Sequence, residues 1–337
     1  MATLKQVAAH ADVSVQTVSN ALNAPHRLRS DTLVRVQKSI ELLRYRPNRN
    51  ARSLRTSAVE LVGYCVPSWP GNQPHPVMDQ FLHALCSAAE TSSRHILLFT
   101  APPGVKGMAV YDDLHARRLV DGFVLSQTET HDPRHEWLAA RDIPFVSFGR
   151  VWGEESQPGS WVDVDGAAGC AAAVRHLHET GRRRIGLLSW TKSSGLAEDR
   201  LSGWRAACKE LRLPTGGLTV RCRQDSTDEG ARGAARLLDA DQPVDAIVAI
   251  SDVLALGAMR EIERRGLAVG VDVAVTGFDD SPLARVVVPG LTSVSQPLDE
   301  IAAALVRQLC DAEQAPRELL LEPGLVVRGS SLVADGN

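Results

Sequence analysis

LKQVAAHADVSVQTVSNALN, residues 4–23, contains two short helical patterns joined by a tight turn. The first pattern places apolar residues at helical spacing on one face: Leu4, Val7, Ala8 and Ala11. A turn at residues 12–13 follows, and Ser14 is a favoured N-cap residue for the second helix. A third amphipathic pattern follows Ser30 and ends before Pro47, because proline disfavours helix in the residue that precedes it. Two short helices with a supporting third predict a helix-turn-helix.

The second of these helices carries an uncharged face whose side chains can all form hydrogen bonds: Gln16, Thr17, Asn20 and Asn23. Amide side chains match the paired donors and acceptors of base edges in the major groove, where the second helix of this motif binds. Gln16 and Asn20 lie one turn apart, so both are predicted to reach neighbouring base pairs. Thr17 suits a phosphate or a thymine methyl. The alternative interpretation is a plain polar surface on a small helical bundle.

Charge is unevenly distributed along the chain. The first 60 residues hold ten Lys or Arg and four Asp or Glu, a balance of +6. The other 277 residues hold 27 basic and 36 acidic residues, a balance of −9, and the two sum to the net charge of −3. A basic head on an acidic body predicts a polyanionic partner for the head. A merely solvated N-terminal segment is the alternative.

Composition narrows the class of protein further. A length of 337 residues is enough for two or three domains. No apolar run approaches the roughly 18–20 residues of a membrane span, and the N-terminus does not resemble a signal peptide. We therefore expect a cytoplasmic protein with no membrane partner. The six cysteines are scattered without a C-x-x-C pair, which favours reduced, buried thiols over a disulfide framework or a metal site.

The body, from about residue 59, contains an internal duplication. VGYCVPSW (62–69) resembles IGLLSW (185–190), and LVDGFVLS (119–126) resembles PVDAIVAIS (243–251). Apolar runs of this kind alternate with helical stretches, a pattern typical of parallel α/β sheets. The duplication therefore predicts two similar parallel-sheet lobes with a ligand cleft at the carboxyl ends of their strands.

Catalytic motifs are missing from this body. The sequence contains no G-x-G-x-x-G, no G-x-x-x-x-G-K-S/T, no G-x-S-x-G and no H-E-x-x-H. We expect a binding protein and not an enzyme, with no metal and no cofactor. An enzyme or a transport-binding protein with an incidental basic head is the competing hypothesis.

Aromatic and polar residues follow the predicted strands. Trp69 and Trp190 end equivalent strands of the two lobes, where flat rings can stack on the C–H faces of sugars. Arg200 and Asp279 offer two-point contacts that suit vicinal hydroxyls, as do the polar groups of residues 251–252. Ordinary packing of the tryptophans and a structural ion pair are the alternatives.

Head and body are joined by a short basic segment, NRNARSLRTS (48–57), in which Leu54 lies between Arg52 and Arg55. An ordinary linker explains this composition. A sharper interpretation makes Leu54 an apolar wedge between base steps of the minor groove, with the arginines at the phosphates.

The head resembles the DNA-binding region of the LacI family, the class of bacterial regulators that includes the lactose and purine repressors. The resemblance rests on TLKQVAAHADVSVQTVSNALN, YRPN and ARSLR, within residues 3–55. It implies a hinge helix that forms on the operator and inserts Leu54 into the minor groove. The DNA contacts that it implies are Thr3, Val15, Gln16, Thr17, Asn20, His26, Arg52, Leu54 and Arg55. Many family members have arginine or histidine where this chain has Asn20, so a different base preference is expected.

The resemblance extends through the body to about residue 330, which is similar to a periplasmic sugar-binding protein. Through EDRLSGW, ISDVLALGAM and TGFDD it implies effector contacts at Arg200, at Ser251 or Asp252, and at Asp279. The other expected effector contacts are Trp69, Met78, Thr128, Arg150, Asp165, Trp190 and Asp225. Met78 and Asp225 stand where many relatives have aromatic residues, and Ser251 replaces a common asparagine. Segments such as FGRVWG and WVDVDGAAG resemble members from actinobacteria that respond to plant-derived sugars and oligosaccharides.

Together these features predict a helix-turn-helix domain (1–47), a hinge helix or linker (48–58) and an effector-binding and dimerisation domain (59–337). The N-lobe is expected to span about 59–160 plus 291–320, and the C-lobe about 161–290 plus 321–335. The expected function is repression by a homodimer that binds a palindromic operator and is released by a sugar or oligosaccharide. A regulator that needs a purine or another small metabolite as co-repressor is the alternative.

Overall fold

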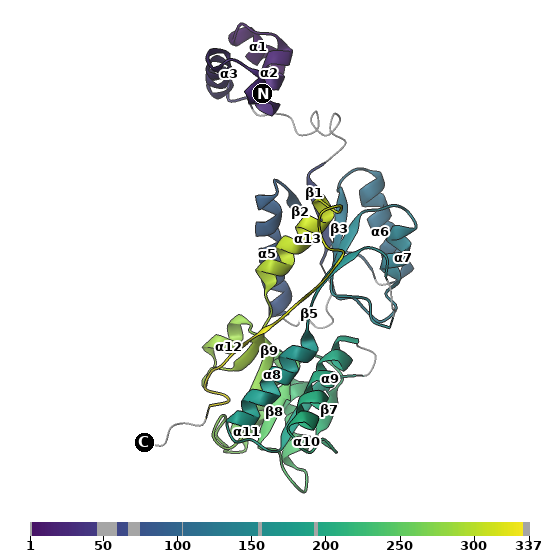
Figure 1. Cartoon of the computed structure of the whole chain (residues 1–337), viewed down its shortest axis with the longest axis vertical. Coiled ribbons are helices and arrows are strands. Elements are labelled where there is room, and N and C mark those ends of the chain that lie inside the picture. Colours follow the sequence, from purple (N-terminus) through teal and green to yellow (C-terminus); the bar gives the residue numbers. More distant parts are fainter. Residues whose placement is uncertain are drawn as a thin grey trace. The chain divides into compact units, whose positions relative to one another are not determined.

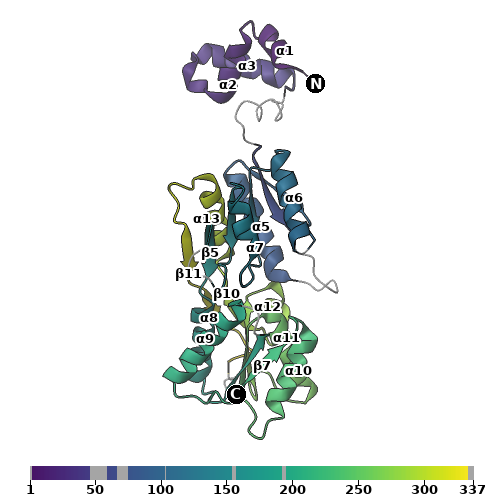
Figure 2. The same cartoon turned by 90° about the vertical axis from the view of Figure 1, so that its right-hand side faces the viewer.

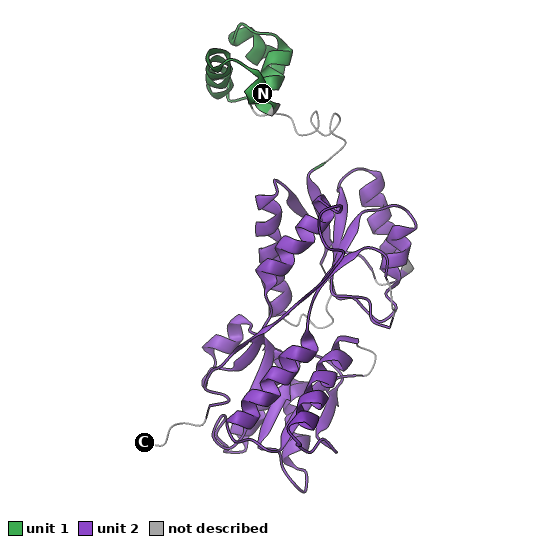
Figure 3. Ribbon diagram, in the orientation of Figure 1, with its two compact units in different colours: residues 1–59 green, residues 60–337 purple. Residues whose placement is uncertain are grey.

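The computed structural model describes residues 2–45, 59–66, 75–102, 104–153, 157–191 and 195–332. The chain divides into two compact units, residues 1–59 and 60–337 (Figure 3). The predicted hinge segment, residues 48–58, lies outside the described residues. The bounds proposed for the head and the hinge therefore stay predictions.

The first unit is a small helical domain with its own core. Its elements are α1 (Leu4–His10), α2 (Val15–Asn23), the 3-10 turn η1 (Pro25–Arg27) and α3 (Ser30–Leu42). Thr3 begins α1 through a capping box with Gln6, and the Ser14 hydroxyl accepts a hydrogen bond from the backbone N–H of Thr17 at 3.1 Å to begin α2. The core is made of Val7, Ala8, Ala11, Val18, Val36 and Tyr45. The helix-turn-helix predicted from the apolar spacing is confirmed.

The second unit is built on two sheets, which define an N-lobe and a C-lobe. In the described residues, the N-lobe sheet has the strand order β11-β5-β4-β3-β1-β2 and the C-lobe sheet has the order β12-β10-β9-β8-β6-β7. The N-lobe strands are β1 (Leu61–Cys65), β2 (His95–Phe99), β3 (Gly122–Leu125), β4 (Phe145–Phe148), β5 (Ser160–Val164) and β11 (Glu318–Leu321). The C-lobe strands are β6 (Ile185–Trp190), β7 (Thr219–Cys222), β8 (Ala246–Ala249), β9 (Ala274–Asp279), β10 (Thr292–Ser295) and β12 (Gly324–Val326).

Helices cover both faces of each sheet (Figures 1 and 2). Those of the N-lobe are α5 (Pro76–Thr91), α6 (Val105–Ala116), α7 (Pro133–Ala139) and α13 (Leu298–Cys310). Those of the C-lobe are α8 (Gly166–Glu179), α9 (Gly195–Glu210), α10 (Thr227–Leu238), α11 (Asp252–Arg264) and α12 (Pro282–Val286). Central strands such as β3 and β8 are buried along their whole length, which explains their continuous apolar runs.

The internal duplication predicted from the sequence is confirmed by the topology. Strands β4-β3-β1-β2 of the N-lobe and β9-β8-β6-β7 of the C-lobe follow the same order, and all of these pairs are parallel. One pair departs from the expected parallel sheets, since β12 runs antiparallel to β10.

Two of the predicted lobe boundaries are wrong by one strand. The N-lobe was expected to end at residue 160, yet β5 pairs with β4 and belongs to the N-lobe sheet. The return to the N-lobe was expected at residue 291, yet β10 pairs with β9 in the C-lobe. A strand next to a crossover has the same apolar pattern whichever lobe it joins, so only its pairing partner reveals its sheet. Within the described residues, no helix is long and apolar enough to cross a membrane.

Candidate functional site

Helix α2 presents its amide face to solvent. The Gln16 side chain donates from Nε2 to Oδ1 of Asn20 at 3.1 Å, which places the two amides side by side on one face. Val15 precedes them with 43% of its surface exposed. The Thr17 hydroxyl lies 2.8 Å from the hydroxyl of Ser14 at the start of the helix. A paired amide face of this kind can exchange its internal hydrogen bond for contacts with base edges.

The other predicted DNA contacts divide into two groups. Thr3 caps α1, and His26 is exposed on η1. Arg52, Leu54 and Arg55 lie outside the described residues, and so does Trp69, which was predicted for the effector site.

In the C-lobe, predicted effector residues gather at the carboxyl ends of four neighbouring strands. Trp190 ends β6, Asp225 follows β7, Ser251 follows β8 and Asp279 ends β9. Since these strands are parallel neighbours in the order β9-β8-β6-β7, their carboxyl ends share one edge of the sheet. Ligands bind at this edge in open α/β sheets.

Arg200 of α9 is the cation at this edge and is 3% exposed. Its guanidinium carbon lies 3.5 Å from the ring centre of Phe278 and 5.8 Å from that of Trp190. One terminal nitrogen donates to the carbonyl of Ile250, and the other lies 4.0 Å from Oδ1 of Asp279. Its Nε is buried and has no hydrogen-bond partner among the described residues. The group is therefore held in place by aromatic rings, while part of its donor capacity stays unused.

Two carboxyl groups, those of Asp279 and Asp225, interact electrostatically with Arg200. Asp279 has φ 112, a conformation that L-residues rarely adopt, and its Oδ1 accepts a hydrogen bond from Nε2 of Gln296 at 2.7 Å. Burial raises the pKa of Asp279 well above its usual value, and the charge of Arg200 opposes this shift. Asp225 accepts a hydrogen bond from the Ser251 hydroxyl. Burial raises the pKa of Asp225, which the Ser251 hydroxyl and the Trp190 indole counteract. The site therefore offers more acceptors than donors, which suits a ligand rich in hydroxyl groups.

Asp252, also predicted as an effector contact, has an interior position. It is 1% exposed, its Oδ1 accepts from the Ser293 hydroxyl at 2.6 Å, and its Oδ2 accepts from the backbone N–H of Ser281 at 2.7 Å. The carboxyl group therefore joins the start of α11 to the segment after β9 and to β10.

The ionisation of Asp252 should leave a measurable trace in the stability of the protein. Burial raises the pKa of Asp252 from 3.8 to about 6, so folding favours its protonated form. Stability from this group is complete below the unfolded pKa and is lost as pH rises through the folded pKa. We compare the free energy of unfolding of the wild type with that of Asp252→Asn. The difference, wild type minus variant, should fall by about 1 kcal/mol between pH 5 and pH 7. Urea unfolding of both proteins measures this difference, and a constant difference would show that Asp252 does not titrate there.

On the N-lobe side, Arg150 connects the two lobes. It follows β4, its Nε lies 3.2 Å from Oδ2 of Asp163 in β5, and its terminal nitrogen donates to Oδ1 of Asp199 in α9 at 3.1 Å. Its guanidinium carbon lies 4.3 Å from the ring centre of Trp152. Trp152 also packs on α9, because a Cβ on Gly195 would stand 2.0 Å from Cγ of this indole. The loop after β4 is therefore closely fitted to the start of α9.

Burial raises the pKa of both carboxyl partners of Arg150, and the arginine lowers it in each case. The other predicted N-lobe residues have supporting roles in this structure. The Thr128 hydroxyl donates to the carbonyl of Arg150 at 2.8 Å, and Asp165 caps α8 by accepting from the N–H of Ala168 at 2.7 Å. Met78 of α5 is half-buried and packs against the N-lobe core.

Sequence reasoning missed several side chains of the site: Asp163, Asp199, Gln296 and Phe278. Asp163 and Asp199 are charged and lie close in sequence to the predicted site residues Asp165 and Arg200. They could therefore have been predicted as site residues. Gln296 carried no signal, because its partner Asp279 comes from another strand, and Phe278 was passed over although it precedes Asp279. Among the described residues, no group of three or more His, Cys, Asp or Glu side chains is placed to hold a metal ion.

Comparison with known proteins agrees with this geometry. Residues 3–48 match the model of bacterial regulatory proteins of the lacI family, and residues 174–331 match that of a periplasmic binding protein-like domain. The HTH-type transcriptional regulator CelR of Thermobifida fusca is 32% identical over 97% of this chain and 98% of its own. MalR of Streptomyces coelicolor is 32% identical over 99% of this chain and 97% of its own.

Solved structures give the same result. The complex of the transcriptional regulator CelR with cellobiose is 30% identical, with a TM-score of 0.72 and coverage of 98% of this chain and all of the other. The lac repressor dimer bound to operator and an anti-inducer is 26% identical, with a TM-score of 0.80 and coverage of 98% and 99%. These relatives regulate transcription and are not enzymes. With a helix-turn-helix head, two lobes like those of periplasmic binding proteins and relatives that match over their full length, the chain belongs to the LacI family of bacterial transcriptional regulators.

Proposed function

We propose that this protein represses sugar-utilisation genes as a cytoplasmic homodimer, and that a sugar or oligosaccharide releases it from a palindromic operator. The family membership supports DNA binding by the head. CelR, which was solved in complex with cellobiose, supports a sugar effector, and the lac repressor, solved as a dimer on its operator, supports the assembly.

The groups that surround Arg200 are the main support for a sugar effector. Trp190 provides a flat apolar ring, Arg200 has an unused buried donor, and Asp225 and Asp279 provide acceptors. Vicinal hydroxyls can pair with such groups at two points while the C–H face of the ring stacks on the indole. A flat nucleobase would be better served by aromatic walls on both sides, and Met78 and Asp225 stand where many relatives have such rings.

The lobes also contain a contact through which an effector can act. Arg150 and Trp152 join the end of β4 to α9, the helix that carries Arg200. A ligand held by Arg200 that changes this contact moves one lobe against the other. The ligand binds one arrangement of the lobes more tightly than the other. This difference in ligand affinity sets how far the operator affinity changes.

A calorimetric titration of the full-length protein tests the effector class. Cellobiose, maltose and longer oligosaccharides are compared with guanine and hypoxanthine, and each ligand that binds is then added to the complex of protein and operator. We expect at least one sugar to bind with a micromolar dissociation constant and to release the DNA. Binding confined to the nucleobases, or DNA binding strengthened by the ligand, would overturn the proposal in favour of a co-repressor.

An exposed apolar patch supports dimerisation through the C-lobe. Leu283, Val286 and Val288 are 39%, 71% and 86% exposed, and they lie together in α12 and the segment after it. A second copy covering this patch would remove the valines from water, so Val288→Asp would bury a carboxylate in the interface. We expect Val288→Asp to weaken the dimer at least about tenfold in sedimentation equilibrium. Val271→Asp, at a valine 49% exposed elsewhere on the lobe, is the matched control and should remain dimeric. Equal dimerisation of both variants would place the interface elsewhere.

A further inference from the structure

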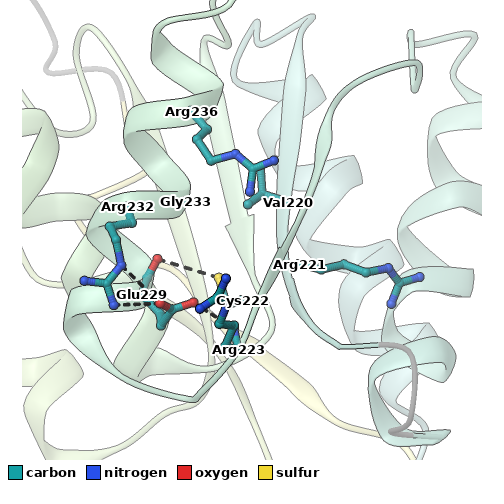
Figure 4. A pocket seen from close by; sticks show the side chains of 8 residues that line it. All are labelled: Val220, Arg221, Cys222, Arg223, Glu229, Arg232, Gly233 and Arg236. Atoms are coloured by element: carbon teal, nitrogen blue, oxygen red, sulfur yellow. Dashed lines mark hydrogen bonds and ion pairs between the residues drawn. The ribbon is translucent and has the colours of Figure 1, made fainter.

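A cavity lies in the C-lobe at the outer edge of its sheet, between edge strand β7 and helix α10. Its volume is about 380 Å³, and Figure 4 shows the lining residues: Val220, Arg221, Cys222, Arg223, Glu229, Arg232, Gly233 and Arg236. None of the proposed effector residues lines it, although its Arg221 donates from a terminal nitrogen to the carbonyl of Trp190 at 3.2 Å. A volume of this size is enough for a small metabolite.

The base of the cavity is apolar and rigid. Val220 and Cys222 of β7 are 6% and 2% exposed. Gly233 allows α10 to approach the strand, because a Cβ there would stand 2.8 Å from Cδ2 of Leu188 and 3.4 Å from Sγ of Cys222. Burial raises the pKa of the Cys222 thiol to about 12, so it stays neutral and is no nucleophile here.

The rim of the cavity is cationic. One of its four arginines, Arg221, points away from the others, with a terminal nitrogen 2.8 Å from Oε1 of Glu198 (Figure 4). Among the other three, Arg232 pairs with the Glu229 carboxylate, whose Oε1 lies 2.6 Å from one of its terminal nitrogens. Oε2 of Glu229 accepts from the backbone N–H of Arg223 at 2.7 Å. Among the described residues, the guanidinium groups of Arg223 and Arg236 form no ion pair, which leaves a surplus of positive charge.

This surplus is unexpected in its setting. Residues 61–337 carry a net charge of −9, and arginines one helical turn apart, such as Arg232 and Arg236, repel each other. Guanidinium groups pair with phosphate at two points and are favoured wherever phosphate is recognised. An anion seated between them would relieve the repulsion, and the concave apolar base would hold the rest of the ligand.

We propose that this cavity binds a small phosphate monoester. Arg232 and Arg236 contact the phosphate from α10, Arg223 contacts it from the loop after β7, and the carbon skeleton lies on Val220 and Gly233. Arg236 and Val220 both line the cavity (Figure 4). The site is independent of the sugar effector proposed above.

Isothermal titration of the full-length protein with glucose 6-phosphate, inorganic phosphate and glucose tests this proposal. Arg236 is exposed, so Arg236→Ala should keep the fold, which circular dichroism verifies. We expect saturable binding of glucose 6-phosphate that Arg236→Ala weakens at least about tenfold. Tighter binding of inorganic phosphate, equally sensitive to Arg236→Ala, would support the site and identify free phosphate as its ligand.

Arg117→Ala is the matched control. It removes one arginine of the N-lobe whose side chain is 69% exposed, so it changes net charge equally, and it should alter affinity less than about twofold. Three results would overturn the proposal: no saturable binding of either phosphate, equal weakening by both variants, or glucose binding as tightly as its phosphate. The basic head, which also attracts anions, is identical in all three proteins.

Discussion

Replacing Arg200 by lysine should lower the affinity for the sugar effector by about 100-fold, while operator binding in the absence of effector is retained. The guanidinium group lies 3.5 Å from the ring centre of Phe278 and bonds the Ile250 carbonyl, so its position is already determined before a ligand arrives. Lysine keeps the charge, but it cannot stack as a plane or donate at two points. Loss of a charge-assisted two-point contact costs about 2–3 kcal/mol, which corresponds to the expected change in affinity.

Lysine is preferred to alanine at this position because alanine would leave the buried Asp279 carboxyl without a positively charged partner. That loss would destabilise the fold. Arg175→Lys is the matched control, because Arg175 of α8 pairs with Glu210 at the surface and its side chain is 47% exposed. Calorimetry with the sugar that binds the wild type measures both variants, and thermal melting verifies their folding. If the Arg200→Lys variant bound sugar as tightly as the wild type, Arg200 would have no part in the site.

Replacing Gln16 or Asn20 by alanine should lower the affinity for the specific operator by roughly 10–100-fold and leave binding to random DNA unchanged. Each amide that pairs with a base edge at two points contributes about 1–3 kcal/mol of discrimination. Binding to random DNA depends on the basic charge of the head, which neither change alters. Asn20→Ala should also broaden the base preference at one position of each half-site.

The operator for this measurement is the DNA that the full-length wild type selects from a random-sequence pool, and fluorescence anisotropy at fixed salt gives the affinities. Gln37→Ala, at an exposed glutamine of α3, is the control and should bind like the wild type. Two results would contradict base recognition by α2. One is an equal loss of operator affinity in Gln37→Ala and Asn20→Ala. The other is a loss of affinity for random DNA, in Gln16→Ala and Asn20→Ala, as large as the loss for the operator.

The head could be predicted almost completely from its sequence. Apolar residues at helical spacing and the N-cap Ser14 specify helices through contacts within one or two turns, so no distant partner was needed to find them. The pairing of Gln16 with Asn20 at 3.1 Å follows from the same local geometry. The duplication in the body was equally visible, because repeated runs of apolar residues specify repeated strands.

The effector site was predicted only in part. Residues at strand ends were found because parallel strands place their carboxyl ends together, and this rule identified Trp190, Ser251 and Asp279. It also selected Asp252, whose carboxyl group joins the start of α11 to the segment after β9 and to β10. The direction of a side chain at a strand end depends on the loops around it, and a sequence pattern does not contain that information.

The helix-turn-helix, the duplicated lobes and the amide face of α2 were predictable from the residue pattern, because each depends on contacts between near neighbours in the chain. Tertiary structure alone decided which sheet β5 and β10 join and that Arg150 reaches Asp199 in the other lobe. It also decided that Arg223, Arg232 and Arg236 surround one cavity. These features join groups from separate elements, and only the packing of the folded chain brings them within reach of each other.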